Sequence, residues 1–213
     1  MKRIVTITGA SGVGKDSLVD ALLGLNGKKD LNEVSNIANS FKLFTAKKMI
    51  PIKELISHTT RQPREGEKEG IDYYYVDMSV FDSLEKVEET EYAGNHYCLA
   101  RSEVDTIADN GVGIVVVDQY GVKCIKAFVD KYKDEYEHIA IFLKGDESIS
   151  YSRMSARGDS KESIEKRIKQ QRERGEYNVN DIKFDMILSA IDVNSFYHNV
   201  ISVQKMLDEQ SEG

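Results

Sequence analysis

The sequence predicts an α/β fold in which helices flank a parallel β-sheet. Short apolar runs rich in β-branched residues alternate along the chain with amphipathic stretches of helical period, as expected for βαβ units. A glycine-rich turn separates the first apolar run from the first amphipathic stretch, so a buried strand leads directly into a helix there. The length of 213 residues and the hydrophobic content of 40% fit one compact domain with insertions or mobile subdomains.

The elements of this core can be placed in order along the chain. Residues 3–8, RIVTIT, predict a short buried strand, and residues 15–24, KDSLVDALLG, predict a helix with its apolar residues on one face. The clearest signal for a buried strand comes from residues 113–118, GIVVVD. The later pattern predicts further strands at 138–143 and 184–188, helices over 120–132 and 194–207, and a strongly charged helical region over 147–176.

Two segments interrupt the alternation of strands and helices. Residues 26–49 are polar and contain several lysines without a clear period, so we interpret them as an inserted loop that could hold one helix. Residues 57–100 are richer in Tyr, Thr, Arg and Glu than in buried aliphatic residues. This composition predicts a small, partly exposed subdomain outside the main core.

Composition limits the partners and the location that we expect. A net charge of −7 leaves no overall basic footprint, so we expect no nucleic acid partner. No long apolar stretch or signal-peptide pattern is present, which predicts a cytoplasmic protein without a membrane partner. The two cysteines, Cys98 and Cys124, are too few for a disulfide framework and are expected to be reduced thiols. A monomer and a homodimer are both compatible with the sequence.

The glycine-rich turn has the spacing of a phosphate-binding loop, G-x-x-x-x-G-K. Glycines allow a tight turn that directs several backbone N–H groups to one point, where phosphate oxygens also meet the positive end of the helix dipole. The lysine would reach the β- and γ-phosphates of a nucleoside triphosphate. The loop therefore predicts an ATP site formed by Gly9, Ala10, Ser11, Gly12, Val13, Gly14, Lys15, Asp16 and Ser17.

Asp16 stands where such loops have Ser or Thr as a ligand of Mg²⁺. A carboxylate is also a hard oxygen ligand, so Asp16 could hold the metal, and Ser17 could instead supply the hydroxyl. Alternatively, Asp16 serves only as a negative charge in the first turn of a helix. We give equal weight to the metal interpretation and the helix-dipole interpretation of Asp16.

A second phosphate site is predicted in the tyrosine-rich segment. Arg61 and Arg64 lie three residues apart around a turn that contains Pro63, so both guanidinium groups could converge. Two forked donors suit a phosphate group, and Tyr73 adds a hydroxyl and an aromatic face. Together with the phosphate-binding loop, these residues indicate a phosphoryl acceptor site.

The motif S-x-T-T-R-x-P-R-x-G-E at residues 57–67, followed by G-x-D-Y at 70–73, resembles the guanylate kinase family. Members of this P-loop family transfer phosphate from ATP to GMP. The resemblance covers most of the chain, with residues 26–49 as extra sequence. It implies a core of 1–56, 101–146 and 177–213, a nucleoside-monophosphate-binding subdomain of 57–100 and a helical lid of 147–176.

The resemblance also implies roles for individual residues. Glu88 would face the guanine edge, as an acceptor for its N–H donors, and Asp118 would end its strand near the acceptor nucleoside and the metal. The acceptor site would comprise Ser57, Arg61, Arg64, Glu67, Tyr73, Glu88, Tyr97 and Asp118. The catalytic residues would be Lys15, Arg61 and the lid arginines Arg153, Arg157 and Arg167.

Several positions depart from the family pattern. Leu99 replaces a serine that usually contacts the guanine, and Val116 replaces an acidic residue. The link from Arg157 to Arg167 is one residue shorter than usual. We therefore expect a divergent ATP-dependent and Mg²⁺-dependent kinase of GMP or dGMP. The alternatives are a kinase of a modified purine monophosphate or of ribose 1,5-bisphosphate, and a non-catalytic guanylate-kinase-like module that binds proteins.

Overall fold

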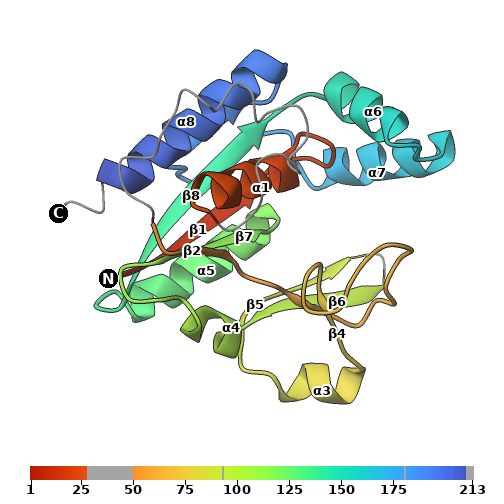
Figure 1. The fold of residues 1–213 in the computed structure, drawn as a ribbon. Helices are drawn as coiled ribbons and strands as arrows, with labels where there is room; N and C mark the ends of the chain where they lie inside the picture. The colour runs from red at the N-terminus through yellow and green to blue at the C-terminus, as the bar shows by residue number, and fades with distance from the viewer. Residues whose placement is uncertain (28–49, 93, 180, 210–213) are drawn as a thin grey trace.

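The computed structural model describes residues 1–27, 50–92, 94–179 and 181–209 (Figure 1). Most of the segment that was predicted to be an inserted loop, 26–49, lies outside these residues. Asn26 is described and buried, where its side chain bonds to Leu22 O, Gln204 Oε1 and the backbone N–H of Ile50. These bonds fix the point at which the described chain leaves the first helix and returns to the core.

The core is a five-stranded sheet whose neighbouring strands are all parallel, which confirms the predicted fold class. Its central strand pairs with a strand on each side, so Ile4 lies opposite Gly113 and His138. In spatial order the strands are β2 (Ile52–Glu54), β7 (Val112–Val116), β1 (Lys2–Thr8), β8 (Tyr136–Lys144) and β9 (Met186–Ser189).

Helices cover both faces of this sheet (Figure 1). On one face, α1 (Lys15–Leu25) and α8 (Val193–Glu209) pack together, and their buried apolar residues form a core cluster with Val5 and Ile7 of β1. On the other face, α5 (Gln119–Lys131) and α4 (Arg101–Asp105) bury a second cluster with Ile4. Alternate β1 side chains thus enter opposite cores, as the period of two requires.

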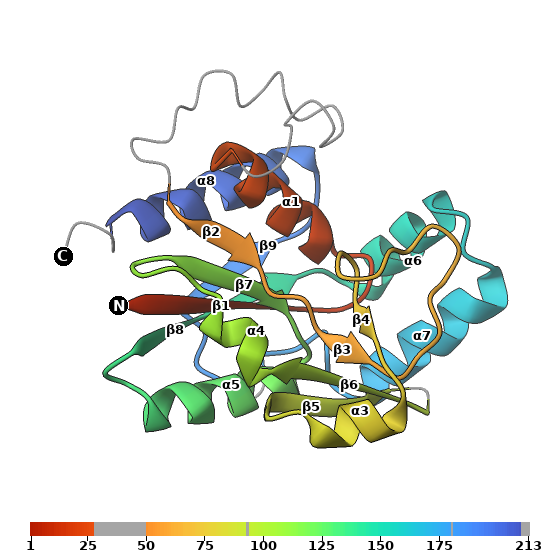
Figure 2. The same ribbon diagram turned by 60° about the horizontal axis from the view of Figure 1, so that its bottom comes forward.

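A second, mixed sheet lies between residues 58 and 100, beside the helix α5 (Figure 2). Within it β3 pairs parallel with β4, whereas β6 pairs antiparallel with β3 and β5. A short helix, α3 (Met78–Ser83), is capped by the Asp77 carboxylate. The strands, in spatial order, are β4 (Tyr74–Tyr75), β3 (His58–Thr59), β6 (Asn95–Ala100) and β5 (Lys86–Tyr92).

The charged region over 147–176 forms two helices, α6 (Glu147–Ala156) and α7 (Lys161–Glu173). Gly158 turns the chain between them with a positive φ of 92°, and the Ser160 hydroxyl caps the start of α7. Met154, Ile164 and Ile168 form the small apolar contact between the two helices. None of the described helices combines the length and apolar character that a membrane crossing requires.

The predicted elements all form, with shifted ends. The strand predicted at 113–118 is β7, which ends at Val116, and Asp118 instead caps the start of α5 through its carboxylate. The prediction that Asp118 belongs to the strand was therefore wrong. The apolar run continues through Val117, past the last paired residue, so the sequence does not show where the strand ends. β8 extends beyond 138–143 at both ends, and β9 begins two residues later than predicted.

Candidate active site

The phosphate-binding loop joins β1 to α1 at the carboxyl end of the sheet, where α/β folds bind ligands. Gly14 adopts a left-handed conformation with a φ of 98° just before the first residue of the helix. Gly9 has a φ of 147°, and a Cβ atom there would lie 2.3 Å from the Leu143 carbonyl oxygen of β8. Glycine is thus required at both positions, and the loop packs directly on the neighbouring strand.

Lys15 is folded into this loop. Its ammonium group donates to the carbonyl oxygens of Gly9 and Ala10 at 2.7 and 2.9 Å. Burial lowers the pKa of Lys15, while the charges of Asp16 and Glu176 oppose that shift. The ammonium group therefore lies inside the turn that the motif assigns to phosphate.

Two cavities open on either side of the loop. The first, of about 480 Å³, lies between the loop, the arginines Arg153, Arg157 and Arg167, and the start of α8. The second, of about 590 Å³, lies between the loop, the mixed sheet and the end of α7. The residues that line both cavities are Ser11, Lys15, Asp16 and Arg167.

The structure brings the predicted site residues to these two cavities. Seven consecutive loop residues, 11–17, line the first cavity, and Gly9 lines the second. Ala10 contributes through its carbonyl bond to Lys15. All eight predicted acceptor residues line the second cavity: Ser57, Arg61, Arg64, Glu67, Tyr73, Glu88, Tyr97 and Asp118.

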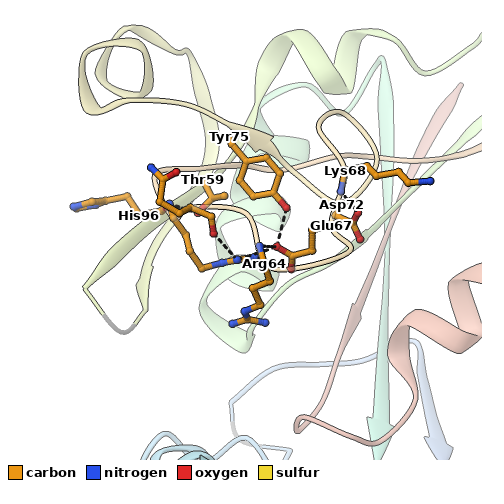
Figure 3. A network of polar contacts seen from close by, with 9 residues as sticks. Thr59, Arg64, Glu67, Lys68, Asp72, Tyr75 and His96 are labelled. Carbon is orange, nitrogen blue, oxygen red and sulfur yellow. Dashed lines mark hydrogen bonds and ion pairs between the residues drawn. The ribbon is translucent and has the colours of Figure 1, made fainter. Parts of the chain in front are cut away.

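Arg61 is fixed by a two-pronged ion pair with Glu67, with Nη1–Oε2 and Nη2–Oε1 distances of 2.9 and 3.0 Å. The same carboxylate accepts the Tyr75 hydroxyl and the Arg64 backbone N–H (Figure 3). The Arg61 hydrogen bond is the main reason that the pKa of Glu67 falls to about 2. The aromatic ring of Tyr73 lies 5.3 Å from the guanidinium carbon. Both Glu67 oxygens are occupied by protein donors, so Glu67 orients Arg61.

The Arg64 side chain is exposed and leads away from Glu67 (Figure 3). Both Arg61 and Arg64 line the second cavity, as their spacing predicts. Arg61 is held in place by Glu67, whereas Arg64 is tied to that carboxylate only through its backbone. Tyr73 and Tyr97 lie edge to face beside them, with ring centroids 5.8 Å apart. This corner of the cavity combines two forked cations with two phenols, a donor set that suits phosphate.

Glu88 also lines the second cavity and is only 5% exposed. Burial is the main cause that raises the pKa of Glu88 to about 7, and the nearby charge of Asp118 adds to the rise. The backbone N–H of Leu99 acts in the opposite direction. Gly121 of α5 allows this packing, since a Cβ atom there would lie 3.1 Å from Glu88 Cγ. The surroundings of Glu88 thus disfavour the ionised form of its carboxyl group.

Asp118 is engaged by several donors. Its Oδ1 atom accepts the Gly121 N–H at 2.8 Å, and its Oδ2 atom accepts the Thr90 hydroxyl at 3.2 Å. Arg174 Nη1 lies 3.8 Å from the same Oδ2 atom. Asp118 therefore connects α5, β5 and the end of α7 along one wall of the second cavity.

The three arginines that line the first cavity have different surroundings. Arg153 donates to Val13 O and Ala190 O at 2.8 Å each and to Gly12 O at 3.4 Å, so it joins α6 to the loop and to the end of β9. Arg157 and Arg167 both contact the Asp159 carboxylate, at 2.6 and 3.4 Å. All three line the first cavity, and Arg167 lies at its junction with the second.

The structure places the Leu99 side chain away from the second cavity. Leu99 has no exposed surface and packs in the core cluster with Val87 and Val104. Its side chain is absent from the lining of the second cavity as formed by the described residues. Only the Leu99 backbone reaches the site, through Glu88. Val116, the other apolar departure, does line this cavity.

Sequence analysis missed the contribution of the end of α7. Arg174 lies over the Tyr92 ring at 5.0 Å and donates to the Glu91 carbonyl oxygen at 3.2 Å. Gln170 Oε1 accepts the Tyr92 hydroxyl at 2.9 Å. These contacts join the end of α7 to β5 beside the second cavity. No sequence signal separates Arg174 from the other arginines and lysines of this charged region.

The oxygen donors at the loop fit a magnesium ion that arrives with its nucleotide. Asp16 and Ser17 are adjacent and exposed in the first turn of α1, and both line the first cavity. The described residues contain no cluster of three metal-ligating side chains. Mg²⁺ commonly uses one or two protein ligands together with substrate phosphates, so this donor set is compatible with it.

A sequence model described as guanylate kinase matches residues 40–210. The chain belongs to the guanylate kinase family. It is 30% identical to the guanylate kinase of Prochlorococcus marinus subsp. pastoris, over 96% of this chain and 98% of the relative. It is also 30% identical to the Schizosaccharomyces pombe guanylate kinase, over 93% of this chain and 88% of the relative.

A solved structure supports the fold of this family member. The crystal structure of guanylate kinase from Anaplasma phagocytophilum aligns with a TM-score of 0.56 and 18% sequence identity. The alignment covers 100% of this chain and 87% of that chain. The arrangement of a parallel sheet, a mixed second sheet and flanking helices is therefore that of a guanylate kinase.

Glu67→Gln should weaken binding of the acceptor nucleotide, because the neutral amide cannot replace both charge-assisted bonds to Arg61. We expect the acceptor KM to rise about 10- to 100-fold, as for the loss of about 1.5–3 kcal/mol, with the ATP KM unchanged. Steady-state kinetics check this, with Glu65→Gln in the same exposed turn as the control. Wild-type acceptor KM in Glu67→Gln would show that Glu67 does not orient Arg61.

Glu88→Gln should stabilise the protein at pH 8 and much less at pH 5.5. The pKa of Glu88 is about 7 in the folded protein and near 4.5 when unfolded, so folding is opposed as pH rises from 4.5 through 7. The neutral amide removes that cost, which reaches on the order of 3 kcal/mol at full ionisation. Urea unfolding at pH 5.5 and pH 8 measures the change in the free energy of unfolding that Glu88→Gln causes.

The neighbouring Glu89→Gln is the matched control for this experiment, because the Glu89 side chain is half-exposed in the same strand. Glu89→Gln should leave the difference in the free energy of unfolding between pH 5.5 and pH 8 as it is in the wild type. An equal effect of Glu88→Gln at pH 5.5 and pH 8 would mean that Glu88 is not a strained carboxylate.

Proposed function

We propose that the protein transfers the γ-phosphoryl group of ATP to the 5′-phosphate of GMP or dGMP. The observation that carries this proposal is the junction of the two cavities. The first is lined by a phosphate-binding loop, and the second by two arginines and a buried carboxylate. Lys15, Asp16 and Arg167 line both, so two bound nucleotides would bring their phosphates together there.

On the donor side, the loop positions the triphosphate. The N–H groups of the loop and the N-terminus of α1 would bind the phosphate oxygens. Lys15 would exchange its bonds to the Gly9 and Ala10 carbonyl oxygens for bonds to the β- and γ-phosphates. When bound with ATP, Mg²⁺ held by Asp16 or Ser17 would neutralise phosphate charge.

On the acceptor side, Arg61 and Arg64 would bind the monophosphate together with Tyr73 and Tyr97. The Glu67 ion pair keeps Arg61 in its orientation before the acceptor arrives, which lowers the entropy cost of binding. In the other half of the cavity, the ionised Glu88 would accept hydrogen bonds from the N1–H and the 2-amino group of guanine.

The transfer itself would require no covalent intermediate with the protein. An oxygen of the acceptor phosphate attacks the γ-phosphorus in line, a new P–O bond forms, and the bond from that phosphorus to the β,γ-bridging oxygen breaks. Arg157 and Arg167 would stabilise the charge on the moving group from the lid side. Arg153, which is bonded to three carbonyl oxygens, would hold the loop in position.

The partners would therefore be small-molecule nucleotides, and a monomer or homodimer stays the expected oligomeric state. Neither the described residues nor the comparisons favour a ribose 1,5-bisphosphate acceptor. A non-catalytic role has no support either, because Lys15, Arg157 and Arg167 are all present at the cavities. Phosphorylation of GMP or dGMP is therefore the one function that we propose.

A panel of nucleoside monophosphates with ATP and Mg²⁺, followed by coupled ADP release, tests this proposal. GMP and dGMP should be used best, IMP less well because it lacks the 2-amino donor, and AMP poorly because its N1 carries no hydrogen. Lys15→Met should abolish turnover with every acceptor. Absence of turnover with all purine monophosphates would refute the kinase assignment.

A further inference from the structure

The donor cavity has two chemically different halves. The phosphate half contains the loop with Lys15, and three arginines, Arg153, Arg157 and Arg167, also line this cavity. The opposite half is formed by the end of β9 and the first turns of α8, and its lining is apolar or aromatic apart from one buried amide. The apolar and aromatic residues there are Ala190, Val193, Phe196 and Tyr197.

Three polar groups of this half are bonded within the protein. The Ala190 N–H donates to Lys144 O and the Ala190 carbonyl accepts Arg153 Nη2, each at 2.8 Å. The Asn199 amide donates to Ser189 O at 2.7 Å and is 7% exposed. These groups hold β9 and α8 together, and using them to bind a base edge would cost those bonds.

Two side chains in or beside this half, Tyr197 and Arg153, carry other polar atoms. The Tyr197 hydroxyl can both donate and accept, so it does not separate an amino group from an oxo group. Arg153 lies between the loop and Ala190, where its Nη atoms bond to backbone carbonyl oxygens of both. Phe196 and Tyr197 pack edge to face with centroids 6.2 Å apart and offer an aromatic wall.

We propose that the donor site, as formed by the described residues, selects its nucleotide through the triphosphate and the flat purine ring, and not through the hydrogen-bonding edge. A 6-oxopurine triphosphate should then serve as phosphoryl donor nearly as well as ATP. Sites that hydrogen-bond a substrate group reject analogues lacking it by about 10⁴-fold, whereas an apolar pocket discriminates weakly between rings of one shape. This inference rests on the proposed function.

The test compares ATP with ITP as donor for the wild-type protein, with GMP as acceptor and chromatographic measurement of GDP. ITP has the same ring shape as ATP, but its N1 and C6 groups have opposite hydrogen-bonding character. We expect kcat/KM for ITP within about tenfold of that for ATP, and a larger loss would overturn the inference. If ATP itself gives no GDP, the proposed function fails instead.

Phe196→Leu provides a second readout, because it removes ring stacking while nearly conserving apolar volume. It should reduce kcat/KM for ATP and for ITP by the same factor, leaving their ratio within twofold of wild type. A variant that changes this ratio more than twofold would show that the wall around Phe196 distinguishes the bases, and would contradict the proposal.

Discussion

The site depends on the position of the phosphate-binding loop, and the Arg153 guanidinium holds that position from the outside. It bonds to carbonyl oxygens of Gly12, Val13 and Ala190, which come from two distant parts of the chain. On the other side, Gly9 packs against the Leu143 carbonyl so closely that no side chain fits. With the loop fixed between α6, β8 and β9, Lys15 is presented to both cavities at once.

The second cavity uses charge in two opposite ways. Arg61 stabilises Glu67 as an anion, so the pKa of Glu67 is low and the pair is rigid. Burial and the charge of Asp118 destabilise the Glu88 anion, so the pKa of Glu88 is high. A carboxylate without good partners gains the most from donors on an incoming base. The folded protein thus tolerates an unfavourable charge at Glu88, which the proposed contact with guanine would stabilise.

The family resemblance supplied Glu88 and most of the other second-cavity residues. Sequence reasoning predicted the elements from periodicity, and Arg61 and Arg64 from motif spacing, because both are local signals. It misplaced Asp118, since an apolar run does not show where pairing stops and a helix cap begins. It could not place the Leu99 side chain in the core, because a resemblance gives the position of a residue in the chain but not the face of its strand. The contact of Arg174 with Asp118 and Tyr92 joins elements far apart in sequence, so no local pattern could reveal it.

The central claim is that two nucleotides bind at once with their phosphates meeting at Lys15. Calorimetry with a bisubstrate analogue, adenosine and guanosine joined through five phosphates, tests it most directly. The account predicts one analogue bound per chain with a Kd at least about 100-fold below that of ATP, because both halves bind as one molecule. Binding no tighter than that of ATP alone would contradict the account, since the two cavities would then not share one phosphate junction.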